Sequence, residues 1–191
     1  MMRSMIRGAV AGLVLVLVAQ AAHAQAGLSL GLGGGLVVPT GTMADGIQTG
    51  WNGMVVARMK PALSPVGLQL DGFYNRFALQ GGVEGHSRML GATADAVFAL
   101  PSAMVARPYL LGGVGMYSGK TSIDGLGSSQ SQTKFGLNAG AGFDFGFSGG
   151  ARLFAEGRFH AILKGVTDPS TGAEKTGYMV PLTVGLRWAM R

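Results

Sequence analysis

The final sixteen residues of the chain, TGYMVPLTVGLRWAMR, alternate between large apolar side chains and small or polar ones. Apolar groups occupy every second position from Tyr178 to Met190, and Thr183, Gly185 and Arg187 lie between them. Successive side chains of a β-strand point to opposite faces, whereas an α-helix repeats about every 3.6 residues. The segment is therefore predicted to be a strand with one apolar face and one small or polar face.

The same period of two recurs along most of the chain. Seven further segments show it, at residues 27–38, 51–60, 66–75, 90–100, 107–118, 133–147 and 151–161. A tilted strand needs about 9 to 11 residues to cross a bilayer, and each segment is long enough. Segment 107–118 is apolar on both faces, so its facing is not assigned by the pattern. Together with the last segment, the periodicity predicts eight strands.

The connections between these segments alternate in length. Four are long and rich in Gly, Ser, Thr and Asp, at residues 39–49, 76–88, 118–133 and 163–176. Three are short, at residues 62–65, 102–106 and 147–150. An up-and-down meander that starts and ends on one side has this order, with long loops outside the cell and tight turns at the periplasmic rim. The predicted fold class is all-β, an eight-stranded antiparallel up-and-down β-barrel.

Alternation alone does not decide whether the apolar face meets lipid or forms the core of a soluble barrel. A soluble surface is about 25 to 35% charged. The polar faces carry few charges, chiefly Arg58, Lys60, Asp71, Asp95, Asp144, Arg152, Glu156, Arg158 and Arg187. This density suits a narrow interior, because an unpaired buried ion costs several kcal/mol and charges there must pair. We therefore expect a transmembrane barrel; a soluble periplasmic, lipocalin-like ligand-binding barrel is the alternative.

The interior of such a barrel is expected to be filled by side chains. A lumen ion network is predicted from Arg58, Asp71, Asp95, Asp144, Arg152, Glu156, Arg158 and Arg187. Glycine accounts for 34 of the 191 residues and would make room inside a cramped barrel. Eight strands enclose a space just wide enough for side chains, so a water-filled diffusion pore is not expected.

Aromatic residues of the apolar parity lie near the strand ends, where membrane interfaces favour amphipathic rings. They predict an aromatic girdle of Trp51, Tyr74, Phe98, Phe135, Tyr178 and Trp188. Ordinary core aromatics are the alternative interpretation.

The N-terminus has the pattern of a cleaved export signal. Arg3 and Arg7 precede an apolar run, and Ala22-His23-Ala24 supplies small residues at the recognition positions for cleavage. The uncharged stretch 8–22 is shorter than the roughly 20 residues of a membrane-spanning helix. We therefore predict a signal peptide over residues 1–24, cleavage before Gln25, and an outer-membrane β-barrel domain over residues 25–191.

Charge and cysteine content exclude several classes of protein. Removal of two arginines with the signal lowers the formal net charge from +6 to +4, which is too mild to indicate a nucleic-acid partner. The chain contains no cysteine, so it has neither a disulfide framework nor a thiolate metal site.

The signal, the eight strands and phrases such as RPYLLGGVGMYSG and LFAEGRFH resemble the small outer-membrane β-barrel family of OmpA-type and opacity-type proteins. In this resemblance, Thr183, Gly185, Trp188 and Met190 fill the family's C-terminal assembly signal, although an aromatic residue is usual at the place of Met190 and Arg191 is added beyond it. It implies a Gram-negative outer membrane, insertion by the barrel-assembly machinery, contact with the bilayer and lipopolysaccharide, and an extracellular surface partner for the long loops.

Glu156, Arg158 and His160 share one strand face, with His160 expected at the outer rim. An acid beside an imidazole suggests an acid-base pair, and an outer-membrane enzyme resembling the lipid A deacylases is an alternative function. Those enzymes use a His-any-Ser pair, however, and Ala161 and Ile162 follow His160. We expect Glu156 to pair with arginines of neighbouring strands instead, and no catalytic residue.

No metal or cofactor site is predicted. The histidines at 23, 86 and 160 follow no ligand spacing, and GLGGGL near residue 31 lacks the strand-turn-helix context of a phosphate-binding loop. The stretch from Ser118 to Thr133 is expected to be a solvated loop, with an adhesive surface as the alternative. The sequence thus favours a non-enzymatic outer-membrane protein with a structural or surface-interaction role carried by four long loops.

Overall fold

The computed structural model describes residues 27–190 except 62, 63, 83, 103, 104, 124, 126, 130, 147–149 and 168–171. The predicted signal peptide, its cleavage position and Arg191 lie outside the described residues. Within the described part of the chain, no helix combines the length and the apolar character needed to cross a membrane.

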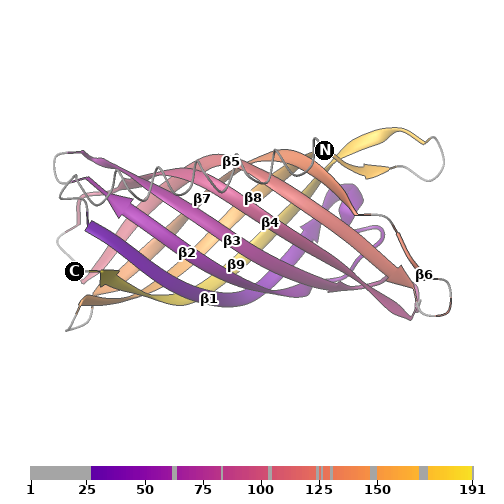
Figure 1. Cartoon of the computed structure of the whole chain (residues 1–191), viewed down its shortest axis with the longest axis horizontal. Helices are drawn as coiled ribbons and strands as arrows, with labels where there is room; N and C mark the ends of the chain where they lie inside the picture. The colour runs from indigo at the N-terminus through magenta and orange to yellow at the C-terminus, as the bar shows by residue number, and fades with distance from the viewer. Residues whose placement is uncertain are drawn as a thin grey trace, which may run out of the picture.

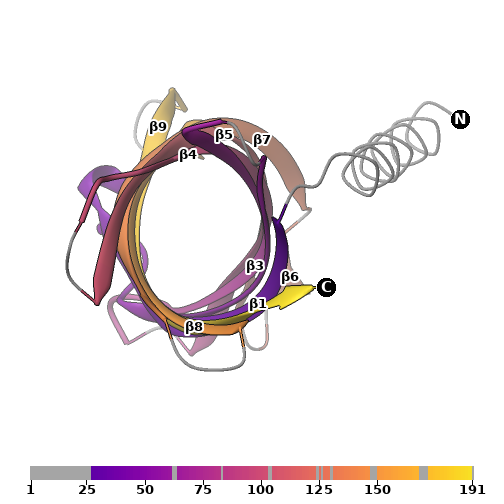
Figure 2. The same ribbon diagram turned by 90° about the vertical axis from the view of Figure 1, so that its left-hand side faces the viewer.

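The strands form one antiparallel sheet that closes on itself (Figures 1 and 2). The elements are β1 Gly27–Thr40, the 3-10 turn η1 Gly41–Met43, β2 Gly50–Lys60, β3 Val66–Ala78, β4 Gly85–Ala99, β5 Ala106–Ile123, β6 Gly127–Ser128, β7 Gln132–Gly146, β8 Ala151–Thr167 and β9 Glu174–Met190. Each long strand pairs with its neighbours in the chain, and β9 pairs with β1 to complete the ring. β6 is a two-residue addition that, among the described residues, pairs only with the end of β5. The predicted eight-stranded antiparallel barrel is confirmed.

Both chain ends of the described barrel lie at one end, which we call the terminal end, and η1 and β6 lie at the opposite, loop end (Figure 1). At the loop end the strands run further than predicted. β5 continues to Ile123 and β8 to Thr167, into segments expected to be loops. Alternation is lost there, but hairpin pairing continues because backbone hydrogen bonds do not depend on side-chain pattern.

Apolar side chains cover the outside of the barrel. Exposed examples are Leu32, Val55, Leu90, Leu137 and Leu182, each between 52% and 60% exposed. Exposing a continuous apolar surface of this kind to water is unfavourable, whereas contact with lipid hydrocarbon is not.

The structure also assigns the facing of β5. Tyr109, Leu111 and Tyr117 point inward and are at most 4% exposed, whereas Leu110 and Val114 are 49% and 59% exposed outside. Both faces of this strand are apolar because one packs inside the barrel and the other meets the surroundings.

Aromatic rings lie at both ends of the outer apolar band. Trp51 and Tyr74 pack together at the loop end with ring centroids 5.4 Å apart, and Tyr178 stacks on Phe159 at the same distance. On β9, Tyr178 and Trp188 are ten residues apart. At a rise of about 3.3 Å per residue and a tilt of about 40°, this corresponds to a height of about 25 Å, the thickness of an outer-membrane apolar band.

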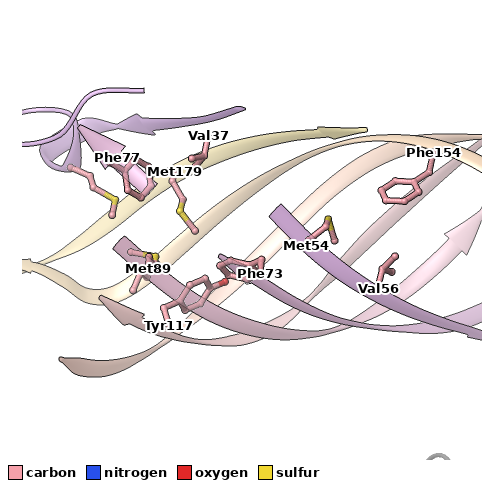
Figure 3. Packing of buried hydrophobic residues seen from close by; sticks show 11 residues of the cluster. Val37, Met54, Val56, Phe73, Phe77, Met89, Tyr117, Phe154 and Met179 are labelled. Atoms are coloured by element: carbon pink, nitrogen blue, oxygen red, sulfur yellow. The ribbon is translucent and has the colours of Figure 1, made fainter. Parts of the chain in front are cut away.

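The interior contains more apolar side chains than the sequence interpretation expected. One buried cluster comprises Val37, Met43, Met54, Val56, Phe73, Phe77, Met89, Tyr117, Phe154, Ile162 and Met179 (Figure 3). A smaller one comprises Val97, Tyr109 and Leu111. Apart from Met43 of η1, these residues share their strand parity with the inward polar groups, so the lumen contains a hydrophobic core as well as ions.

Glycines on β1 let its two neighbours meet across it. Gly35 lies directly opposite Asn52 of β2 and Thr183 of β9. Above this glycine, Asn52 Nδ2 donates to Thr183 Oγ1 at 2.8 Å, and both side chains are at most 5% exposed. A side chain at position 35 would collide with the backbone of Leu182. The glycine run that superficially resembles a phosphate loop therefore serves packing inside the barrel.

Candidate functional site

Arg158 on β8 lies at the centre of the buried charges in the lumen. Its guanidinium contacts Asp71 on β3 at 2.5 Å, Asp95 on β4 at 2.9 Å and Glu156 on its own strand at 2.5 Å. Arg158 and its three partners are each at most 5% exposed. A rigid guanidinium fork with five N–H donors can satisfy several carboxylates at once, which a lysine cannot do.

Neutral polar side chains fix the two aspartates of this group. Gln69 Nε2 donates to both oxygens of Asp71 at 3.1 Å. Thr93 Oγ1 donates to Asp95 Oδ2 at 2.9 Å, and the other Asp95 oxygen accepts a bond from Asn138 at 2.7 Å. Each aspartate therefore has neutral donors in addition to the guanidinium.

Glu156 has a neutral donor as well. The hydroxyl of Tyr109, on β5, donates to Glu156 Oε2 at 2.8 Å, and both residues are buried. All three buried acids are thus held by a cation and by at least one neutral side chain, contributed by strands on different sides of the barrel.

A second ionic group lies nearer the terminal end. Asp144 on β7 accepts from Arg58 of β2 at 3.2 Å and forms an ion pair with Arg187 of β9. Arg58 also lies 3.6 Å from Glu156, which connects this group to Arg158. The strands that contribute to the two groups are β2, β3, β4, β5, β7, β8 and β9. Among the described residues, β1 supplies no side chain to either group.

The structure places seven of the eight residues predicted for the ion network within these two groups. The eighth, Arg152, also points inward but pairs with no carboxylate of the described residues. It lines a cavity at the terminal end together with Lys60. The reason is its position near the start of β8, beyond the last inward acid of the barrel, Asp144.

His160 does not lie at the outer rim, contrary to the expectation. Because β8 continues to Thr167, His160 falls well inside the strand and is 2% exposed. Its Nδ1 lies 2.8 Å from the Tyr117 hydroxyl, and its ring makes an edge contact with Phe73 at a centroid distance of 5.7 Å. A lipid substrate has no access to an imidazole enclosed in this way, so the geometry disfavours the lipid-modifying alternative.

Metal binding finds no support either. Among the described residues, no group of three or more His, Cys, Asp or Glu side chains is arranged to hold a metal ion. The three acids around Arg158 already share a cation, which occupies the place that a metal would take.

The residues of the predicted assembly signal have two kinds of environment on β9. Thr183 and Gly185 point inward, where Thr183 accepts the bond from Asn52 and Gly185 faces the ring of Phe154. Trp188 and Met190 point outward and are 45% and 53% exposed. The girdle residues Phe98 and Phe135 are likewise exposed, at 49% and 65%.

The sequence interpretation missed the neutral partners of the network. Gln69, Thr93, Asn138 and Tyr109 share the parity of the charged residues on their strands. That parity was a usable signal for the first three. Tyr109 could not be placed because both faces of its strand are apolar.

Comparison with known proteins agrees with this architecture. Residues 9–187 match the family described as outer membrane protein beta-barrel domain. Neisserial surface protein A has a similar structure, with a TM-score of 0.66 and 16% identity over 85% of this chain and 97% of that one. No curated protein sequence matches the chain.

Two further solved structures share the fold. A major outer membrane protein from Thermus thermophilus has a TM-score of 0.58 and 12% identity over 86% of this chain and 99% of that one. Ail, the attachment invasion locus protein of Yersinia pestis, has a TM-score of 0.53 and 17% identity over 86% of this chain and 97% of that one. Identities this low indicate a common fold and no more.

A closed eight-stranded barrel with an apolar exterior and an ionic interior defines a small integral protein of the bacterial outer membrane. The chain belongs to the outer membrane protein beta-barrel domain family. The soluble periplasmic barrel, the alternative left open by the sequence, is thereby wrong: the apolar stripes face outward.

Proposed function

We propose that this protein is a non-catalytic outer-membrane barrel that conducts no solutes, and that its loop end carries contacts with partners outside the cell. The observation that carries the first half is Arg158, held in the lumen by carboxylates of β3, β4 and β8. Breaking a buried ion pair costs about 3 to 5 kcal/mol, so this cluster is a stable obstruction.

The free space beside Arg158 supports the same conclusion. The cavity that Arg158 and His160 line has a volume of about 20 Å³. About 10 to 15 Å³ of such free space holds one water molecule, so the cavity has room for about one and not for a continuous column of water. The apolar cluster around Phe77 and Met179 adds a further barrier between this level and the loop end.

A flux measurement tests the closed lumen. The mature protein is refolded into phospholipid vesicles, and the entry of a small sugar is followed by swelling, with empty vesicles as the baseline and porin-containing vesicles as the positive control. We expect swelling at the baseline rate. Sugar entry above the baseline would refute the closed lumen.

Contacts outside the cell are proposed for the extended hairpin of β5, β6 and β7. Its side chains are short and hydroxylic, and they hold the hairpin in place: Ser118 Oγ lies 2.7 Å from Ser131 Oγ, and Ser129 Oγ accepts from the Thr121 amide at 3.0 Å. Such a surface offers many donors and acceptors with little apolar area, as recognition loops commonly do. The other proposed partners are the bilayer with its lipopolysaccharide and, during insertion, the barrel-assembly machinery.

Protease treatment of intact cells tests this arrangement. Cleavage should be confined to the loop-end segments, residues 41–49, 79–84, 124–131 and 168–173. A variant in which an Asn-Gly turn replaces residues 124–131 should fold normally yet lose partner binding, whereas the same change at 168–173 serves as the matched control. Protection of all four segments on intact cells would contradict the proposed orientation.

A further inference from the structure

A basic cavity lies inside the barrel at the terminal end. Its volume is about 290 Å³, far larger than the space beside Arg158. Five cationic side chains and one carboxylate are among its lining residues: Arg58, Lys60, Arg107, Arg152, Arg187 and Asp144. Five positive charges less one negative charge leave a formal excess of four.

Only part of this charge is neutralised. Asp144 forms ion pairs with Arg58 and Arg187. Arg107 is the register partner of Asp144, but no carboxylate of the described residues forms an ion pair with Lys60, Arg107 or Arg152. The turns at this end, residues 61–65, 100–105 and 147–150, contain no Asp or Glu in their sequence, so their side chains add no negative charge. The rim of the cavity is therefore positively charged.

Two of the cations are held against each other. Arg152 and Arg187 are direct partners in the β8–β9 register, and both belong to the inward face. Like charges directly opposite each other destabilise an antiparallel pair. Arg187 is only 2% exposed, and its Nε has no hydrogen-bond partner among the described residues. A buried unused donor next to an unpaired guanidinium is the arrangement that an oxyanion relieves.

The floor of the cavity is closed and fixed. The guanidinium of Arg58 lies over the ring of Tyr109 at 4.1 Å and donates through Nε to Gln69 Oε1 at 2.5 Å. These contacts hold a cationic surface across the lumen between the cavity and Glu156. The space is thus a cup that opens at the terminal end rather than a passage.

We propose that this cup binds a phosphate-bearing polyanion about the size of pyrophosphate. Guanidinium groups match the geometry of phosphate oxygens, and an almost carboxylate-free wall excludes cations. At about 10 to 15 Å³ of such space for each water-sized group, the volume admits two linked phosphate groups together with water. The phosphate belongs either to a soluble phosphate compound or to a phospholipid headgroup. The site goes beyond the proposed function, and a closed lumen does not require it.

Calorimetric titration of the mature barrel in phosphatidylcholine nanodiscs tests the site, with inorganic pyrophosphate as the probe at about 0.05 M NaCl, where screening is weak. We expect one saturable site. Arg107→Gln and Arg152→Gln should each weaken binding about fivefold, and the double variant about 25-fold, because each removes one nearby charge. Neither side chain belongs to the ionic groups around Arg158 and Asp144, so both variants should fold.

Arg88→Gln is the matched control, because it removes the same charge from an exposed position near the start of β4 at the loop end and should leave the affinity unchanged. Heat-dependent gel mobility verifies that each variant is folded. The proposal is overturned if pyrophosphate shows no saturable binding up to about 10 mM, a concentration that would reveal even millimolar affinity. It is equally overturned if the double variant binds as the wild type does.

A second lipid composition identifies the source of the phosphate. In nanodiscs that contain phosphatidylglycerol, competition by headgroups would lower the apparent affinity for pyrophosphate, and the competition would disappear in the double variant. An unchanged affinity would assign the site to soluble phosphate compounds. Both results support the cup as a phosphate site, and they differ only in the molecule that supplies the group.

Discussion

At the scale of single residues, Arg158 forms ion pairs with three buried carboxylates. Replacing it by leucine leaves Asp71 and Asp95 buried without a cation and leaves Glu156 only the more distant Arg58, so we expect a loss of about 3 to 5 kcal/mol in the free energy of unfolding. Urea titration of the refolded barrel in lipid vesicles, followed by tryptophan fluorescence, measures the loss.

The control for this prediction is Arg88→Leu, which removes an exposed arginine at the loop end and should change stability by less than about 0.5 kcal/mol. A variant that also neutralises the three acids, with Asp71→Asn, Asp95→Asn and Glu156→Gln added to Arg158→Leu, should recover much of the loss, because it contains no unpaired buried charge. A loss below about 1 kcal/mol for the single variant would show that water solvates the acids.

Large inward side chains commonly face a glycine on the adjacent strand. Direct register partners of this kind are Phe73 with Gly91, Asp95 with Gly113, Tyr109 with Gly142, Arg158 with Gly140, Phe154 with Gly185, and Arg187 with Gly31. At each of these glycines, the nearest atoms to an added Cβ include the partner residue. The barrel is so narrow that a large inward side chain leaves no room for a Cβ on the strand beside it, and this accounts for many of the glycines in the chain.

Gly91 provides the clearest test of this pairing, because all three nearest atoms to its added Cβ belong to the ring of Phe73. We expect Gly91→Ala to cost about 1 to 3 kcal/mol of unfolding free energy through overpacking. In a Phe73→Ala background the same change should cost much less, which a double-mutant cycle by urea titration would measure. Gly53→Ala is the control, since its Cβ would meet nothing closer than a Trp51 carbon at 4.0 Å. Equal costs in both backgrounds would count against the pairing.

The charged residues of the lumen could be predicted from the sequence because few charges occur on the strands and they share one parity. The inward apolar residues could be placed only through polar neighbours of the same parity, since a phenylalanine such as Phe154 is by itself equally suitable for lipid and for the core. Only its two neighbours of the same parity, Arg152 and Glu156, indicate the inward direction. On β5 no charged residue lies between Tyr109 and Tyr117 to indicate the inward face. The facing of this strand therefore follows only from its register in the closed sheet.

At the scale of elements, β9 both closes the ring and carries the predicted assembly signal. In the predicted assembly signal an aromatic residue is usual at the place of Met190, which points outward with 53% exposure. We therefore predict that Met190→Phe accelerates insertion by the assembly machinery, measured as the folded, heat-modifiable fraction over time. The stability of the folded barrel should change little, because the side chain already meets the outside.

Met59→Phe is the control for this prediction. Met59 and Met190 are both register partners of Leu28, so the two methionines lie in one row at the terminal end. If recognition depends on the position within β9, only Met190→Phe accelerates insertion. Equal acceleration by both variants would show that an added aromatic ring at this depth is sufficient.

Element boundaries were less predictable than element identity. Except in β5, the membrane-crossing part of each strand alternates because lipid selects one face, and the sequence therefore revealed it. Beyond the aromatic belt both faces of a hairpin meet water, and this selection disappears. The ends of β5 and β8 consequently lie in sequence that is typical of loops, and His160 was placed at a rim that lies further along the strand.

At the scale of the whole molecule, we expect the aromatic belts to mark the depth of the barrel in the bilayer. Val184 lies near the midpoint between Tyr178 and Trp188 and is 55% exposed. An arginine there should cost about 2 to 4 kcal/mol, and the same change at Thr176, beyond the loop-end belt, about 0 to 1 kcal/mol. Urea titration in vesicles measures both. Similar costs at the two positions would mean that the belts do not mark the membrane interfaces.

The glycine strand β1 has a consequence for how the cylinder is completed. The ionic groups join seven strands without it, while Asn52 and Thr183 reach each other above Gly35. A curled ribbon running from β2 to β9 could accordingly assemble its charged interior first. In the last step, β1 would form its main-chain hydrogen bonds with β2 and β9, and few bulky inward side chains would have to interdigitate. If β1 inserts last between β2 and β9, its inward glycines offer little steric resistance to the strand.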